Sequence, residues 1–264
     1  MRKYGLAALL ACVAAAPAAD LRLPLRSRVE PFKGSGVWRE VRFEQSFPVK
    51  ETAILICDMW DKHWCQGASA RVEVLARKMA PLIERARKRG LLIIHAPSDT
   101  MAFYKEHPAR ERVLAIAKAE PPALLVLPDP RLPIDDSDGG CDTPEKSYKA
   151  WTRQHAAIRI DERDAISDNG LEVYSLMRQA GVRNLFIMGV HTNMCVLNRT
   201  FAIKRMTRWG VPCVLVRDLT DAMYDPQDPP HVSHERGTEL VVEHIEKHWC
   251  PTVLSADLMR ALGR

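Results

Sequence analysis

The chain has 264 residues, of which 47% are hydrophobic and 27% are charged, and its formal net charge is +5. This composition is typical of a globular protein, and the length favours one large domain with extensions over two domains. Basic and acidic residues are interleaved along the sequence, which argues against the basic stripe of a nucleic-acid-binding protein. We therefore predict a single globular domain that does not bind nucleic acid.

Residues 1–19 have the pattern of a secretory signal peptide. Two basic residues precede an apolar run over 6–16, and small residues follow at 16–18. The apolar run is too short to cross a membrane, and no later window has 18 consecutive apolar residues, so no membrane span is predicted. We expect export to the periplasm or the medium. A competing interpretation treats "LLAC" as a lipoprotein signal in which Cys12 carries the lipid.

Strands and helices are predicted to alternate after an N-terminal extension. Residues 20–50 are rich in Pro, Arg and Glu and show no sustained period, so we predict an extended arm over the surface, followed by one domain over residues 51–258. Apolar runs predict strands at 52–60, 91–96, 156–160, 184–190, 213–218 and 252–254. Three- and four-residue spacing and end signals predict helices at 69–89, near 110–119, at 168–180, at 193–209 and near 237–248.

This alternation predicts an α/β fold of three layers, α/β/α, with a doubly wound, mostly parallel, six-stranded sheet. Ligands of such open sheets bind beyond the carboxyl ends of the strands. Asp58, His95 and the segment 190–195 stand at those ends. A proline-rich loop over residues 121–147 is long for a compact domain, and loops of this length are often functional.

Cys195 lies in the first turn of its predicted helix. Unpaired N–H groups and the helix dipole favour a thiolate there, and a thiolate is the nucleophilic form of cysteine. The same N–H groups can hold an oxyanion, and a carboxylate such as Asp58 can take the thiol proton and return it to a leaving group. On spacing alone, the alternatives are that Cys195 is a small core residue and Asp58 a turn residue.

The segments "AILICDMWDKHW" and "DAISDNGLEVYSLMRQAGVRNLFIMGVHTNMCV" resemble the isochorismatase-like cysteine hydrolases, the family of nicotinamidases and isochorismatases, over roughly residues 50–255. The most specific piece is Gly-Val-x-Thr-x-x-Cys-Val, here 189–196. The resemblance implies that Asp58 and Cys195 are catalytic. It also implies a cis peptide between Val190 and His191, which directs the N–H groups of His191 and Cys195 at the oxyanion.

The implied activity is hydrolysis of a small-molecule substrate, with amide C–N bonds as the first class to try, by a protein that self-associates as a homo-oligomer. The family lysine after the third strand is absent, however. Arg153, Arg159 and Arg163 are the candidates for its charge. Arginine can hold a carboxylate but cannot act as an acid near neutral pH. The alternative is a non-catalytic ligand-binding pseudoenzyme on the same fold.

His63, His95 and His191 offer a further alternative, because all three are expected near one pocket. Three histidines with an open position suit catalytic zinc, and a metal-assisted hydrolase would follow. Against it, the Asp-x-His metal pattern of nicotinamidases is broken by Met101, and the histidines can equally be polar walls of the pocket beside Trp60 and Val190. No cofactor is firmly predicted.

The remaining cysteines raise the question of disulfides. Cys65 and Cys141 both stand in loops that are expected to cover the site, and export permits a bridge between them. The state of Cys250 stays open. An acidic run (Asp135, Asp136, Asp138 and Asp142) lacks the spacing of an established calcium loop and is predicted to be a solvated loop.

Overall fold

The computed structural model describes residues 20–143 and 145–263. The predicted signal peptide, with Cys12 as the alternative lipidation site, lies outside the described residues, so export stays a prediction. No helix within the described ranges is both long enough and apolar enough to cross a membrane.

An eight-stranded mixed sheet forms the centre of the molecule, in the order β2-β1-β8-β7-β6-β3-β4-β5. The strands from β8 to β5 run parallel, and β1 is antiparallel to both of its neighbours. The strand bounds are Leu21–Val29 (β1), Arg39–Phe47 (β2), Thr52–Cys57 (β3), Leu92–Ala96 (β4), Ala165–Ile166 (β5), Asn184–Val190 (β6), Cys213–Asp221 (β7) and Thr252–Val253 (β8).

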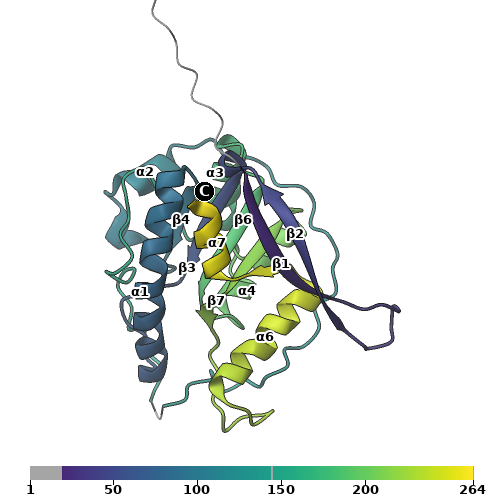
Figure 1. Cartoon of the computed structure of the whole chain (residues 1–264). Coiled ribbons are helices and arrows are strands. Elements are labelled where there is room, and N and C mark those ends of the chain that lie inside the picture. The colour runs from purple at the N-terminus through teal and green to yellow at the C-terminus, as the bar shows by residue number, and fades with distance from the viewer. Residues whose placement is uncertain (1–19, 144, 264) are drawn as a thin grey trace, which may run out of the picture.

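Helices cover both faces of the sheet. α1 (Gln66–Arg89) and α7 (Ser255–Leu262) lie side by side on the face toward the viewer in Figure 1. The opposite core contains residues of α3 (Gly170–Gln179), α4 (Cys195–Asn198), α5 (Ile203–Arg208) and α6 (His234–His248). A short α2 (Pro108–Leu114) packs near β5, and two 3-10 turns span Val49–Glu51 and Met101–Tyr104.

The central strand β3 is apolar along its whole length because both of its faces are buried. All six of its residues are buried, with Ile54 and Ile56 in the core on the α1 side and Ala53 and Leu55 in the core on the other side. A parallel strand covered on both faces reads as a continuous apolar run, as the sequence predicted. The three-layer α/β architecture is thus confirmed.

The prediction of six strands is wrong, because residues 20–50 supply two more. They form an antiparallel hairpin that belongs to the sheet, where the sequence analysis expected an extended arm over the surface, and its turn projects from the body in Figure 1. Leu21, Leu23 and Leu25 alternate with exposed residues and bury their side chains in the core under α1 and α7. Period-two alternation is the signature of a half-buried strand.

Two elements of the domain also differ from the prediction. Residues 156–160 are not a strand; Ile158 packs into the core on the α1 side, and the edge strand beside β4 is the two-residue β5. The helix predicted over 193–209 is split into α4 and α5. At the break, the Thr200 hydroxyl accepts the N–H of Gly170 at 2.9 Å, and the Thr200 carbonyl occupies the space where a Gly170 side chain would lie.

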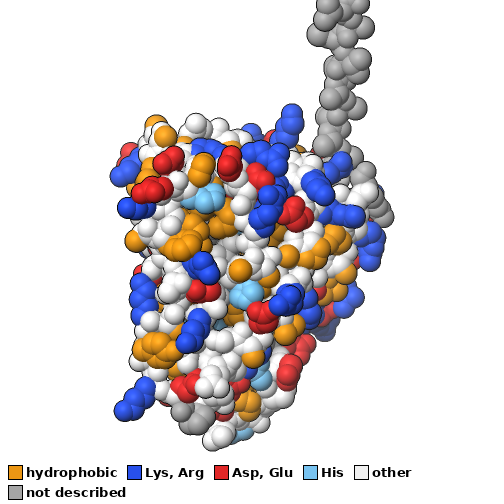
Figure 2. Space-filling model, turned by 90° about the vertical axis from the view of Figure 1, so that its left-hand side faces the viewer, with side chains coloured by type: hydrophobic (Ala, Val, Ile, Leu, Met, Phe, Trp, Pro, Cys, Tyr) orange, Lys and Arg blue, Asp and Glu red, His pale blue; other side chains and the backbone are white. Residues whose placement is uncertain are grey.

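Charged side chains of both signs are interspersed over the face drawn in Figure 2, with hydrophobic side chains between them.

Candidate active site

Asp58 follows β3 directly and is completely buried. Its backbone adopts φ 45°, an unusual conformation for a residue with a side chain. One carboxylate oxygen accepts the N–H of Ser98 at 2.7 Å, and the other accepts Nε of Arg199 at 3.0 Å. The carboxylate is thus held from two sides, by the loop after β4 and by the end of α4.

Cys195 is the first residue of α4, which follows β6 after a tight turn. The peptide between Val190 and His191 is cis, as the resemblance implied. Gly189 makes the approach to this turn feasible: its φ is 123°, and a side chain there would lie 2.0 Å from the carbonyl oxygen of Cys57 in β3. The strand ends therefore come close enough for the Cys195 thiol to interact with the Asp58 carboxylate.

Burial dominates the acid–base chemistry of this pair. It raises the pKa of the Cys195 thiol, and the neighbouring Asp58 anion raises that pKa further, while Arg199 and the N–H of His191 lower it. Burial also raises the pKa of Asp58, and Arg199 and the Ser98 N–H oppose this shift. The raised pKa favours the neutral thiol over the thiolate that the sequence analysis expected, because burial outweighs the effect of the four-residue α4.

Arg199 supplies the positive charge that the sequence analysis sought elsewhere. Its side chain is one-third exposed and bridges Asp58 to Asp99, whose Oδ2 lies 3.4 Å away. The three arginines suggested by the sequence pair outside the site: Arg153 with Asp61, and Arg159 and Arg163 with Asp161. Arg199 stands four residues after Cys195, so helical spacing alone could have identified it.

The ring of His191, which follows β6 directly, lies against the ring of His63. Their ring centroids are 5.0 Å apart in an edge-to-face arrangement. Burial lowers the pKa of His191 to about 3 and the pKa of His63 to about 4. Both rings are therefore neutral near pH 7, and Nε2 of His191 is buried without a hydrogen-bond partner within the described chain.

His95 lies in a separate buried network. Nδ1 lies 3.0 Å from Oε1 of Gln154 and Nε2 lies 2.9 Å from Oδ2 of Asp164, so both nitrogens are occupied. Arg87 also binds the Asp164 carboxylate, at 2.6 Å. Burial opposes ionisation of Asp164, but hydrogen bonds from His95 and Arg87 outweigh it and lower its pKa to about 2. The three-histidine zinc site is therefore not assembled in the part of the chain described.

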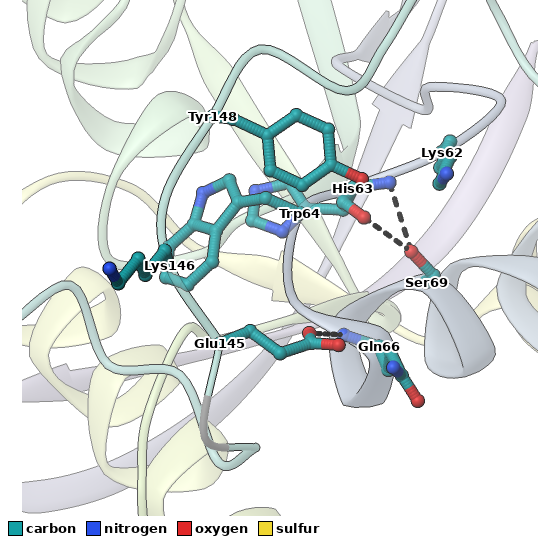
Figure 3. A pocket seen from close by; sticks show the side chains of 8 residues that line it. All are labelled: Lys62, His63, Trp64, Gln66, Ser69, Glu145, Lys146 and Tyr148. Atoms are coloured by element: carbon teal, nitrogen blue, oxygen red, sulfur yellow. Dashed lines mark hydrogen bonds between the residues drawn. The ribbon is translucent and has the colours of Figure 1, made fainter.

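Stacked aromatic rings connect the site to an open cavity. Trp60 donates its indole N–H to the carbonyl of Ser98 and stacks on Trp151 at 4.3 Å, with His63 stacked on Trp151 at 5.8 Å. His63 in turn lines a cavity of about 620 Å³ together with Trp64, Tyr148 and five other residues. Figure 3 shows this cavity, in which the Ser69 hydroxyl bonds to both the N–H and the carbonyl of His63.

No family model matches the chain, and no curated protein matches it either. Among solved structures, a cysteine hydrolase from Pseudomonas syringae pv. phaseolicola 1448A superimposes with a TM-score of 0.52 at 15% identity, covering 82% of this chain and 94% of that chain. The chain shares the fold of this cysteine hydrolase. This finding confirms the fold that the resemblance implied.

Two further solved structures are similar to this cysteine hydrolase fold at lower TM-scores. An isochorismatase family protein from Burkholderia thailandensis has a TM-score of 0.44 at 14% identity and covers 81% of this chain and 97% of that chain. An isochorismatase family protein from Desulfovibrio vulgaris subsp. vulgaris str. Hildenborough has a TM-score of 0.45 at 16% identity. The superposition covers 81% of this chain and 99% of that chain.

On this cysteine hydrolase fold, the residues singled out from the sequence fall into two groups. Asp58, Val190, His191 and Cys195 meet at the ends of β3 and β6, with Trp60 and His63 beside them, whereas His95 belongs to the Asp164 network. The sequence analysis missed Arg199, Ser98 and Trp151. Ser98 acts through its backbone N–H, which no residue pattern reveals, and Trp151 comes from a loop without periodic sequence.

Proposed function

We propose that this protein is a hydrolase in which Cys195 is the nucleophile and Asp58 the proton carrier, acting on a small-molecule substrate, with an amide C–N bond as the bond cleaved. One observation carries the proposal. A fully buried carboxylate interacts with the thiol and is tied to a guanidinium at 3.0 Å, in a fold whose solved relatives include a cysteine hydrolase.

In the proposed mechanism, Sγ of Cys195 attacks the carbonyl carbon while its proton passes to the Asp58 carboxylate. The tetrahedral intermediate collapses as Asp58 protonates the leaving amine nitrogen, which breaks the C–N bond and leaves a thioester on Cys195. A water molecule then gives its proton to Asp58 and its oxygen to the thioester carbon. The acid product leaves and the proton returns to the sulfur.

Arg199 does not accept or donate a proton in these steps, because a guanidinium stays charged throughout the accessible pH range. Its role is to keep Asp58 ionised in a buried setting and to favour the thiolate as it forms, since it lowers the pKa of both groups. Asp58 is then the single proton carrier of the site.

Backbone N–H groups of the turn before α4 are the proposed oxyanion donors. The N–H of His191 already reaches the Cys195 sulfur, and the N–H of Cys195 opens α4 and so lacks a partner within the helix. Removing one such donor in other hydrolases costs about 10²–10³ in rate. His63 lines the cavity and its ring contacts the ring of His191, and the low pKa of both rings favours an uncharged substrate beside them.

The test is a screen of small amides and esters with the full chain, followed by mass spectrometry of the quenched reaction. We expect amine release, a Cys195-linked acyl adduct, and a loss of turnover of about 10⁴-fold in Cys195→Ala. Cys213→Ala removes a buried thiol outside the site and serves as the control. Saturable binding of a compound without any adduct or turnover, and unchanged by Cys195→Ala, would instead favour the pseudoenzyme.

A further inference from the structure

A second cluster of reactive side chains lies at the start of α1, outside the Cys195 site. The thiols of Cys65 and Cys141 and a carboxylate oxygen of Asp142 all lie within 4.8 Å of one another. Cys65 directly precedes α1, whereas the other two come from the long loop before β5. Two segments more than 70 residues apart in the sequence therefore bring three potential ligands, two thiols and one carboxylate, to one point.

Glycines on both segments make this approach feasible. A side chain on Gly67 would lie 2.2 Å from Oδ1 of Asp142, so the carboxylate occupies the space that the glycine leaves. Gly140 has φ 62°, and a side chain there would lie 2.3 Å from the carbonyl oxygen of Met223. The cluster is thus held by the backbone and does not depend on flexible side chains alone.

Outer contacts orient all three groups. The Thr143 hydroxyl lies 3.5 Å from the sulfur of Cys65 and 3.2 Å from the sulfur of Cys141. Arg71 binds Oδ2 of Asp142 at 2.5 Å, while Oδ1 lies 3.4 Å from the Cys65 sulfur. Ligating carboxylates and thiolates in metal sites are commonly fixed by such outer hydrogen bonds.

The geometry and the charges match a zinc ion. Zinc binds sulfur at about 2.3 Å and carboxylate oxygen at about 2.0 Å in a tetrahedron, which puts the sulfur and the oxygen roughly 3.5 Å apart. The separation here is 3.4 Å. Two thiolates and the Asp142 carboxylate carry three negative charges, which one Zn²⁺ ion would offset together with the Arg71 guanidinium that Asp142 shares with Asp221.

We propose that Cys65, Cys141 and Asp142 bind one Zn²⁺ ion, with solvent as the fourth ligand. Binding forms two Zn–S bonds and one Zn–O bond and releases the two thiol protons to solvent, with no redox change. A disulfide between Cys65 and Cys141 is the competing state. The disulfide would need an external oxidant to form. It would also give no role to the Asp142 carboxylate and the Thr143 hydroxyl, which lie beside the two sulfur atoms.

The ion would fix one wall of the cavity beside His63. Trp64 and Gln66 flank Cys65 and line the cavity on one side, while Glu145 and Tyr148 line it from the loop that follows Asp142. Glu145 already accepts the N–H of Gln66 at 2.8 Å, so the two walls meet at this point. Metal binding would hold this loop against α1 and keep the shape of the cavity.

The experiment uses the full chain, purified without an affinity tag, fully reduced and dialysed against chelator. Titration with Co²⁺ is expected to give a sulfur-to-cobalt charge-transfer band that saturates at one ion per chain and is displaced by Zn²⁺. The band should be lost in Cys65→Ser and in Cys141→Ser. Arg71→Gln, which keeps all three ligands, should keep the band and weaken binding by about 10–100-fold.

Cys213→Ala and Asp135→Asn are the matched controls, because they remove a thiol and a carboxylate outside the cluster and should bind Co²⁺ as the wild type does. The proposal is overturned if the reduced wild-type protein shows no sulfur-to-cobalt band, or if the band survives both cysteine substitutions. A reduced protein that binds no ion but re-forms a Cys65–Cys141 disulfide in air also overturns it.

Discussion

Three influences act on the proton of Asp58 at the end of β3, and two of them oppose the third. The Ser98 N–H and the Arg199 guanidinium stabilise the anion, whereas burial favours the neutral acid. The net shift raises the pKa of Asp58, which suits a carboxylate that must accept a proton from a thiol and give it up again.

Removal of the Arg199 charge should therefore disable the site without removing either reacting group. In Arg199→Gln the pKa values of Asp58 and Cys195 both rise, because Arg199 lowers both. We expect kcat/KM to fall by about 10²-fold or more and the acidic limb of its pH profile to move to higher pH.

The control for this change is Arg199→Lys, which keeps the positive charge. It should recover part of kcat/KM, with the acidic limb of the pH profile near its wild-type position. A uniform loss of rate in Arg199→Gln with an unmoved pH profile would show that Arg199 merely supports the fold.

The buried network around Asp164 predicts a pH dependence of stability. Its pKa is lowered to about 2 from an ordinary 3.8, so the carboxylate stabilises the native state fully above pH 4. That contribution is lost as the pH falls through 2. We expect the free energy of unfolding, measured in urea, to decline between pH 4 and pH 2.

Asp164→Asn should flatten this decline and lower the free energy of unfolding near pH 7 by about 3–5 kcal/mol, because Arg87 loses its buried partner. Asp257→Asn, which removes a surface ion pair with Arg260, is the comparison and should change stability by less than about 1 kcal/mol. Equal effects of the two substitutions would contradict the account.

Among the elements, the break between α4 and α5 determines where Arg199 lies. Thr200 packs its backbone onto Gly170, and the chain leaves the helix there. The sequence analysis predicted one continuous helix because its apolar spacing continues through the break. A helix end that results from packing against a glycine of a neighbouring helix cannot be predicted from the local residue pattern.

Gly170→Ala tests this packing. The added methyl carbon would lie 2.0 Å from the Thr200 carbonyl oxygen, so the segment carrying Arg199 must shift. We expect lower activity together with lower thermal stability, and Gln179→Ala at the exposed end of the same helix should change neither. Normal activity in Gly170→Ala would show that the position of Arg199 does not depend on this contact.

The β1–β2 hairpin shows how an element was overlooked although its pattern was present. Leu21, Leu23 and Leu25 alternate perfectly, but β2 has a single buried residue, so half of the hairpin carries no apolar signal. Leu23→Ala should lower the free energy of unfolding by about 2–5 kcal/mol, as measured by chemical denaturation. Val29→Ala, at the exposed end of the same strand, should have little effect.

At the scale of the whole molecule, the buried parallel strands were predictable and the sheet edges were not. β3, β4 and β6 read as continuous apolar runs because helices cover both of their faces. The edge strand β5 has only two residues, and the other edge strand, β2, has a single buried residue, so neither produces an apolar pattern. The two-residue β8 lies inside the sheet and was predicted at 252–254. The site followed the same rule: side chains at the ends of β3 and β6 could be predicted, whereas partners from loops could not.

The fold brings the ends of β3 and β6 together with α4, and the central claim is that Asp58, Cys195 and Arg199 act as one electrostatic unit. The most direct test is the rate of Cys195 alkylation by iodoacetamide against pH, followed by peptide mass spectrometry. Near pH 7 we predict that Asp58→Asn reacts faster than the wild type and that Arg199→Gln reacts more slowly, because the anion raises and the cation lowers the pKa of the thiol. Coincident profiles for all three proteins, matching a free model thiol, would contradict the claim.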